Sequence, residues 1–573
     1  MIIWRNKESD VVDSKDAVPA RPVEVNERVT EKGEIVAKEA DEALGAHTES
    51  IAVDYVYQRK VFIVNKLLNE DIGMTPWQWG LLCVCGVGWL LDNVWLQLVA
   101  IILPQIVNEF DITPDKHSGF MTLALFSGLT VGAATWGVLA DIVGRRFSFN
   151  MTLLIAGVFG VAMGGARSFT ALGGLIAALG FGLGGSLPVD GMLFLEFIPG
   201  RMQYLLTLLS VFWPLGQLLV SLVGWAFIAN YSVENCKAPD CGTTNGFDNQ
   251  GWMHGNKGWR YLSFTMGALT LVCFLVRFAV LRLPESPKFL LSKNRDAEAI
   301  AALRRFAEMC GRPLAEDKIS VAILRSAAGQ DGLMDNEEEL IEQPDGLAAR
   351  IKHSLGKMVQ NARTIELGKS LTHLRPLFST FALGYTVSVI WTLWGLVGLA
   401  YPLFNAFLPT YLHTGGDEST YTTYRNYVIV SVCGVPGSIL AAALVEVPRS
   451  GRRGAMALGT LLTGVFLFGM TGVSTSDGTL AFSCVSTFTQ NIMYGVLYCY
   501  TPETFPAPYR GTGDGISSSL NRLFGLMAPI IYIYSGTSKS EAQIPIYVAA
   551  ALFIVSALLM LTLRVETNKR TAL

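Results

Sequence analysis

The chain has 573 residues, of which 51% are hydrophobic and only 16% are charged. Soluble domains average about 25% charged residues, so the composition excludes a water-soluble enzyme, a nucleic-acid-binding protein and a secreted disulfide scaffold. The net charge of −3 is too small to indicate a polyionic partner. Charged residues concentrate in 1–75, in 284–376 and at the C-terminus, and apolar runs of about 20 residues separate these blocks. Because each run can cross a bilayer core of about 30 Å as a helix, the sequence predicts an all-α polytopic membrane protein.

Twelve membrane-spanning helices are expected. They lie at about 79–103, 119–140, 149–166, 171–196, 204–230, 259–282, 383–411, 426–446, 454–473, 478–500, 512–534 and 543–565. An even number puts both termini on one side, and the distribution of Lys and Arg favours the cytosol. We expect a multi-pass protein of the plasma membrane that works as a monomer.

This count of spans divides the chain into five parts. Residues 1–78 have no signal-peptide core and are rich in charge, which predicts a largely disordered cytosolic tail. One six-helix half at 79–283 and another at 383–565 flank a cytosolic loop, 284–382, with short amphipathic helices, one of them within NRDAEAIAALRRFAEMC. A cytosolic tail, 566–573, ends the chain.

The outer loop 231–258 holds two cysteines close together, Cys236 and Cys241. If the loop is extracellular, these two can form a disulfide; two free thiols are the alternative. Asn230 starts a glycosylation sequon that abuts the membrane, and its use is left open. No cysteine or histidine spacing resembles a metal site, so no metal is predicted.

The chain contains an internal repeat. The second span ends in GVLADIVGRRFSF and the eighth in LVEVPRSGRRGAM, so that Gly144-Arg145-Arg146 matches Gly451-Arg452-Arg453. Glu196 matches Glu503 at the same offset of 307 residues. One constant offset indicates two six-helix halves built alike, an arrangement typical of secondary transporters.

These motifs also carry a family resemblance. The run Gly137-Val-Leu-Ala-Asp141-Ile-Val-Gly144-Arg145-Arg146 resembles the loop signature of the major facilitator superfamily. Pro284-Glu285-Ser286-Pro287 and Pro502-Glu503-x-x-Pro506 resemble its sugar-porter-related branch. The closest resemblance lies in the run Gly180–Glu196 and in Leu67-Leu68-Asn69 ahead of the first span. These segments are similar to proton-coupled metabolite symporters, especially fungal ones, that are related to niacin transporters and the synaptic vesicle glycoprotein 2 family. Over about 60–565, this resemblance implies a twelve-helix transporter that works by alternating access.

The loop signature is expected to govern the movement of the halves. Gly137 and Gly144 allow helix ends to approach closely. Asp141 is expected to meet the positive end of the helix that starts near Thr512. Pro448 replaces this aspartate in the second copy, so the second latch is expected to be weaker or differently built.

Arginines and glutamates at the inner helix ends complete the expected latch. Arg145, Arg146 and their second copies, Arg452 and Arg453, are either latch partners or plain membrane anchors. The repeated Glu196 and Glu503 are expected to form framework latches with Arg201 and Arg510.

Three charged residues lie inside apolar spans, where each costs about 2.5–3.5 kcal/mol and needs a reason. They are Asp92, Asp190 and Arg522, and the other half has leucine at each matching position. Asymmetry in a repeated scaffold points to the ligand and coupling site. Asp514, near a helix start, is expected to be a cap.

The surroundings of Arg522, RGTGDGISSSLNRLFGLMAP, resemble the eleventh helix of organic-anion carriers, where the arginine binds the anion. A guanidinium can hold a carboxylate through two parallel hydrogen bonds. A structural ion pair with Asp92 or Asp190 is the alternative.

The proton carrier is expected to be a carboxylate, because all six histidines lie in loops or tails. Asp92 is the first candidate, with a further role in substrate binding, and Asp190 is the second; a static polar pair is the alternative. Asn405, Gln217, Trp391 and Trp394 are further substrate-binding candidates, although tryptophans often simply face lipid.

The sequence therefore predicts proton-coupled uptake of a small organic anion across a lipid bilayer, without a cofactor. The anion is expected to be a carboxylate, and whether it is aromatic is left open. The alternatives are a proton-antiport efflux pump, a sugar or polyol porter, and a non-transporting sensor. No nucleophile–base pair or phosphate loop indicates an enzyme. Substrate identity, direction and proton stoichiometry stay open.

Overall fold

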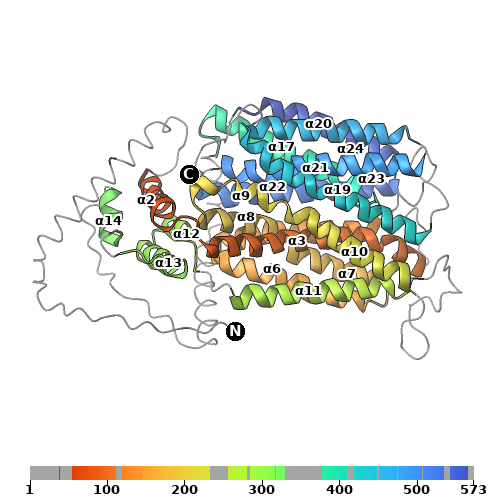
Figure 1. Cartoon of the computed structure of the whole chain (residues 1–573), viewed down its shortest axis with the longest axis horizontal. Helices are drawn as coiled ribbons and strands as arrows, with labels where there is room; N and C mark the ends of the chain where they lie inside the picture. Colours follow the sequence, from red (N-terminus) through yellow and green to blue (C-terminus); the bar gives the residue numbers. More distant parts are fainter. Residues whose placement is uncertain are drawn as a thin grey trace, which may run out of the picture.

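The computed structural model describes residue 38 and the segments 55–110, 119–143, 145–232, 256–280, 284–315, 318–328, 377–408, 419–447, 451–473, 475–505, 507–534 and 543–564. All regular elements in these segments are helices. The long helices run side by side in one bundle, and the short helices α2, α12, α13 and α14 lie together beyond one end of it (Figure 1).

The bundle consists of two halves. The first half contains α3 (Pro76–Glu109), α5 (Gly119–Val143), α6 (Arg145–Gly164), α7 (Phe169–Leu183), α8 (Ser186–Phe197), η3 (Gly200–Met202), α9 (Leu205–Leu209), α10 (Phe212–Tyr231) and α11 (Gly258–Val280). The second half contains α17 (Phe381–Asn405), α19 (Thr420–Glu446), α20 (Gly451–Thr471), α21 (Ser476–Thr504), α22 (Ala507–Gly525), α23 (Met527–Tyr534) and α24 (Ile544–Thr562). Each half forms six spans, because α7 with α8, α9 with α10 and α22 with α23 are each one interrupted helix.

Eleven of the twelve predicted spans are long and apolar enough to cross a membrane within the described part of the chain. The twelfth, α21, has 29 residues and lies within the bundle (Figure 1). Its low hydropathy has a structural reason. The polar side chains Ser483, Ser486, Thr489, Gln490 and Asn491 are buried against other helices instead of facing lipid.

The halves are packed internally by close helix pairs. In the first half α5 packs on α7 and α6 on α11; in the second, α21 packs between α19 and α20. Small residues permit the closest crossing, since a methyl group at Gly128 of α5 would overlap the carbonyl of Ala177 in α7. The halves meet each other along two seams, α10 with α19 and α5 with α22.

A separate cluster of short helices caps one end of the bundle. This end module comprises α2 (Tyr55–Leu67), η2 (Leu68–Ile72), α12 (Pro287–Ser292), α13 (Asp296–Met309) and α14 (Val321–Ala327). We call the neighbouring end of the bundle the module end. Residues 55–72 were expected in a largely disordered tail; they are helical because their apolar face packs on the central-loop helices.

An ion pair holds the end module together, and a hydrogen bond and a ring contact fix it to the first half. Within the module, Lys60 Nζ of α2 lies 2.7 Å from Asp296 Oδ2 of α13, and both side chains are buried. The amide of Gly200, between α8 and α9, donates to Asn69 Oδ1 at 2.7 Å. The ring of Trp77 in α3 lies 5.1 Å from that of Phe306 in α13.

The entry into α3 is built by local sequence. Gly73 adopts φ +63°, a left-handed conformation that side chains resist, and reverses the chain after η2. Thr75 and Gln78 form a capping box, and Pro76 occupies the first helical turn. This turn orients α3 and thereby places Asp92 at mid-bundle.

Candidate functional site

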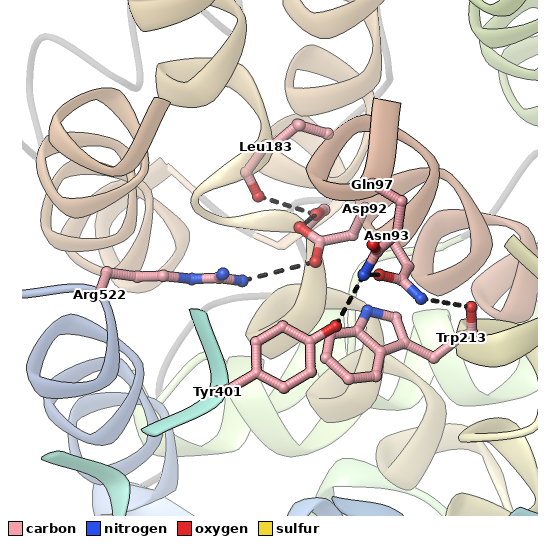
Figure 2. Close-up of polar contacts among 8 residues, drawn as sticks. Asp92, Asn93, Gln97, Leu183, Trp213, Tyr401 and Arg522 are labelled. Atoms are coloured by element: carbon pink, nitrogen blue, oxygen red, sulfur yellow. Dashed lines mark hydrogen bonds and ion pairs between the residues drawn. The ribbon is translucent and has the colours of Figure 1, made fainter. Parts of the chain in front are cut away.

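Asp92 lies in the middle of α3 and is fully buried. The hydroxyl of Ser186, at the start of α8, donates to the carbonyl of Leu183 at 2.8 Å and lies 3.4 Å from Asp92 Oδ1. The interruption between α7 and α8 places this hydroxyl beside the carboxylate. The indole of Trp213 lies on another side of it (Figure 2).

The partner of Asp92 is Arg522, which reaches across from α22 in the other half. Arg522 Nη2 lies 3.4 Å from Asp92 Oδ2, and the arginine side chain is almost fully buried (Figure 2). Two residues that the sequence selects separately, 430 positions apart, thus meet at the centre of the bundle. This ion pair joins the two halves.

Asp190 does not take part in that pair. It lies in α8 and binds Arg277 of α11, with both side chains buried inside the first half. The guanidinium of Arg277 also covers the ring of Phe149. Sequence reasoning missed Arg277, although an arginine within the apolar part of the predicted span 259–282 was a usable signal. The coupling role of Asp190 stays a prediction.

An amide and tyrosine network surrounds the pair on the side away from the module end. Asn93 donates to the carbonyl of Trp213 at 2.8 Å, and Gln97 donates to the hydroxyl of Tyr401 at 2.9 Å (Figure 2). Tyr427 of α19 donates to Gln97 Oε1. Gln97 therefore connects α3 with two helices of the other half. The spacing of Asn93 and Gln97, four residues apart in an apolar helix, could have revealed this network.

Aromatic rings enclose the same centre. Trp213 lies 5.3 Å from Tyr401 and 5.0 Å from Tyr494, measured between ring centroids. Tyr498 lies 4.7 Å from the predicted candidate Trp394, whose indole donates to Thr501 Oγ1 at 2.9 Å. Trp391, the other candidate, packs instead on Phe378 near the module end, 5.8 Å between centroids.

The two amide candidates are both buried near this centre. Asn405 donates to Gln490 Oε1 at 2.9 Å. The amide nitrogen of Gln490 has no hydrogen-bond partner among the described residues, so it is a free donor, whereas the Gln217 side chain interacts with Tyr427. A buried, unpaired donor is costly in a resting protein and is typical of a ligand site.

The predicted latch residues form two equivalent ion pairs at the module end. Arg145 binds Glu196, and Arg452 binds Glu503 with 2.6 Å between Nε and Oε2. The expected partner of Glu196 was wrong, because Arg201 lies exposed on η3 while Arg145 starts α6 directly beside the end of α8. Arg453 donates to the carbonyl of Leu561 at 2.8 Å.

The structure describes only some of the other predicted residues. A methyl at Gly137 would lie 3.8 Å from the Cα of Gly515, so α5 and α22 do approach closely there. Gly144, Cys236 and Cys241, and the side chains of Asp141, Arg146 and Arg510, lie outside the described residues. Asn230 is exposed and donates to the carbonyl of Ala226.

Helices of the two halves contact each other at both ends of the bundle. At the module end Gly137 of α5 packs on Gly515 of α22. At the opposite end Gly119 of α5 packs on Pro529 of α23, and Tyr424 of α19 donates to the carbonyl of Ile101 at 2.8 Å. A buried charged site between two repeated halves is typical of a secondary transporter. No group of three metal-binding side chains occurs in the described part of the chain.

Comparison with known proteins gives the family. Residues 80–529 match the Major Facilitator Superfamily, and the chain belongs to it. The chain is 42% identical over 527 residues to "MFS siderochrome iron transporter 1" of Ceriporiopsis subvermispora, covering 91% of this chain and 93% of that one. It is 26% identical to "Niacin transporter NiaP" of Acinetobacter baylyi, over 89% of this chain and 98% of the relative.

The fold has solved counterparts as well. The proton:xylose symporter XylE matches with a TM-score of 0.61 at 17% identity, over 86% of this chain and 97% of the other. The predicted superfamily, branch and twelve-helix fold are thereby confirmed, and the chain is a membrane transporter and not an enzyme.

Proposed function

We propose that the protein carries a small organic carboxylate together with a proton, and that Arg522 and Asp92 form its site. The observation that carries this proposal is the single 3.4 Å contact between Arg522 Nη2 and Asp92 Oδ2 across the two halves. A guanidinium offers donors for two parallel hydrogen bonds, and Asp92 engages only one nitrogen. A substrate carboxylate can therefore compete with Asp92 for Arg522.

Charge balance couples the two ligands. In the empty site the charges of Arg522 and Asp92 cancel. When a substrate carboxylate takes Arg522, Asp92 is left as an uncompensated buried charge, which is costly. A proton on Asp92 removes that charge, so the loaded site is neutral again and the halves can close around it. Substrate without a proton leaves one negative charge and opposes closure.

The aromatic side chains around the ion pair favour a substrate in which the part attached to the carboxylate is aromatic or otherwise apolar. Trp213, Tyr401 and Tyr498 present ring faces and edges within the same enclosure. A relative at 26% identity is named a niacin transporter, and niacin is an aromatic carboxylate. We place the protein in the plasma membrane with both termini and the end module in the cytosol, and take uptake as its direction.

Proteoliposomes test this proposal. Because small acids cross lipid unaided when protonated, transport is measured as counterflow of labelled nicotinate or benzoate, and liposomes with Arg522→Ala give the background. We expect counterflow with the natural protein, none above lipid leakage with Arg522→Ala, and faster uptake when the outside is acidic. Equal counterflow with and without Arg522 would overturn the anion site. Acceleration by an acidic compartment on the opposite side would indicate efflux by antiport.

A second candidate follows from the relative at 42% identity, whose name indicates an iron chelate. A ferric siderophore in the same panel decides between them. Counterflow of the siderophore but of no small acid would replace the carboxylate proposal. A response only to a hexose or a polyol would indicate a sugar porter.

A further inference from the structure

Two arginines at the module end of the second half have no acidic partner. Arg145 and Arg452, at equivalent positions of the repeat, each bind a glutamate. Arg453 contacts a backbone carbonyl instead, and Arg564 contacts aromatic rings. Neither forms an ion pair with a carboxylate in the part of the chain that the structure describes. Both therefore keep a positive charge that no described side chain compensates.

The two arginines lie at the same end of α24. This helix packs on both α17 and α20 in the second half (Figure 1). From α20, Arg453 Nη2 donates to the carbonyl of Leu561, in the last turn of α24, at 2.8 Å. Arg564 follows Leu561 by three residues and contacts the other neighbour, α17. Two positive charges thus meet where α24 ends.

Aromatic rings hold Arg564 in place. Its guanidinium carbon lies 5.3 Å from the ring centroid of Phe381 and 5.2 Å from that of Tyr385, one turn farther along α17. The two rings stack on each other, with 6.3 Å between their centroids. Contact with a ring face leaves the N–H groups of a guanidinium available, because they lie in its plane. Arg564 is therefore oriented and still able to bind an anion.

An exposed apolar surface leads along the bundle to these arginines. Its members recur every three or four residues on two helices: Leu458, Leu461 and Val465 on α20, and Val555, Leu558 and Leu561 on α24. In a membrane transporter, exposed apolar side chains of the spans face the acyl chains of lipids. A phospholipid that lies against this surface has its phosphate at the level of the helix ends, where the two arginines lie.

We propose that Arg453 and Arg564 bind the headgroup phosphate of an anionic phospholipid whose acyl chains lie against α20 and α24. Arg453 uses one nitrogen for the carbonyl of Leu561, and its other donors have no partner among the described residues. Guanidinium groups bind phosphate through parallel hydrogen bonds. Phosphatidylcholine fits less well, because its choline adds a third positive charge to a site that holds two. This site is separate from Arg522 and does not depend on which substrate is carried.

Native mass spectrometry of the full-length protein in detergent tests the site, with dioleoyl phosphatidylglycerol and dioleoyl phosphatidylcholine as probes. Arg453→Gln and Arg564→Gln each remove one charge, and glutamine at 453 can still donate to the carbonyl of Leu561. Arg201→Gln is the matched control, because Arg201 is an exposed arginine of the first half. Half-saturation of the first phosphatidylglycerol site should require about fivefold more lipid in each variant and about 25-fold more in the double variant. The control should bind as the natural protein does.

The aromatic rings permit a second test that leaves both charges in place. Phe381→Leu combined with Tyr385→Leu removes the rings and keeps apolar side chains. Half-saturation by phosphatidylglycerol should then require about 2–5-fold more lipid, because Arg564 loses its cation–π contacts. Phe468→Leu changes another exposed ring, on α20, and should have no effect. Thermal unfolding in detergent shows that each variant is folded.

Three results would overturn the assignment. An equal loss of lipid binding in Arg201→Gln would mean that the general positive charge of the protein attracts the lipid. Equally tight binding of phosphatidylcholine would contradict a site for an anionic headgroup. Displacement of phosphatidylglycerol by an equal concentration of glycerol phosphate, which has no acyl chains, would indicate a site for soluble phosphate esters.

Discussion

Asp92→Asn tests the exchange of partners at Arg522 most directly, because it keeps the shape of the side chain and removes its charge. At 3.4 Å, two unit charges attract each other by about 5 kcal/mol with an effective dielectric constant of 20. Loss of one partner from a buried ion pair costs about 3–5 kcal/mol, because the other charge is left uncompensated. The empty variant should therefore unfold at a lower temperature than the natural protein.

The same change should strengthen substrate binding. In the natural protein an incoming carboxylate must displace Asp92, and the displaced aspartate must take a proton; in the variant neither step is needed. Over the pH range in which Asp92 is ionised in the empty site and protonated in the loaded site, natural affinity should therefore fall by about tenfold per pH unit. Asp92→Asn should bind with an affinity that is independent of pH and at least about tenfold tighter at pH 8.

Benzoate binding is measured by tryptophan fluorescence between pH 5.5 and 8.5, and thermal unfolding is followed with and without ligand. The ligand should raise the unfolding temperature more in Asp92→Asn than in the natural protein, since it supplies the missing counter-charge. Asp190→Asn serves as the comparison, because it removes a carboxylate from the pair with Arg277 inside the first half; this variant should keep the pH slope. A natural pH slope in Asp92→Asn would refute the exchange mechanism.

Three further predictions concern the scaffold. Glu503→Gln should destabilise the protein by about 3–5 kcal/mol by leaving Arg452 without its counter-charge. The double variant with Arg452→Glu and Glu503→Arg should recover part of the lost stability, measured by thermal unfolding. An equal loss of stability in the single and the double variant would argue against the ion pair. Gly88→Ala should cost about 1–3 kcal/mol because its methyl overlaps the carboxylate of Asp190, whereas Gly80→Ala in the same helix meets nothing within 4 Å and should not destabilise. Lys60→Met should speed hydrogen exchange in α2, since Asp296 loses a buried partner. Glu298→Gln serves as its control: Glu298 forms a half-exposed ion pair with Arg295, so this variant should change stability by less than about 1 kcal/mol. Unchanged exchange in Lys60→Met would show that apolar packing alone holds the end module.

The sequence by itself determined the spans, the repeat and three of the charges inside the bundle, Asp92, Asp190 and Arg522. Hydropathy decides which segments enter the bilayer, and it does so locally, so the helices could be located without a structure. The polar helix α21 was also located, because its place in the repeat compensates for its low hydropathy. The constant offset of 307 residues revealed the two halves, and the asymmetry of Asp92, Asp190 and Arg522 singled out the centre.

Only the tertiary structure decided which charge meets which. Asp92 pairs with Arg522 and Asp190 with Arg277, although the sequence allowed Arg522 to pair with either aspartate. Glu196 binds Arg145 and not Arg201, which is nearer to it in the sequence. The packing of the helices, and not the number of residues between two positions, sets the distance between their side chains. The folding of residues 55–72 onto the central loop has the same cause. Partner choice depends on how helices far apart in the chain cross, and no local pattern encodes that crossing.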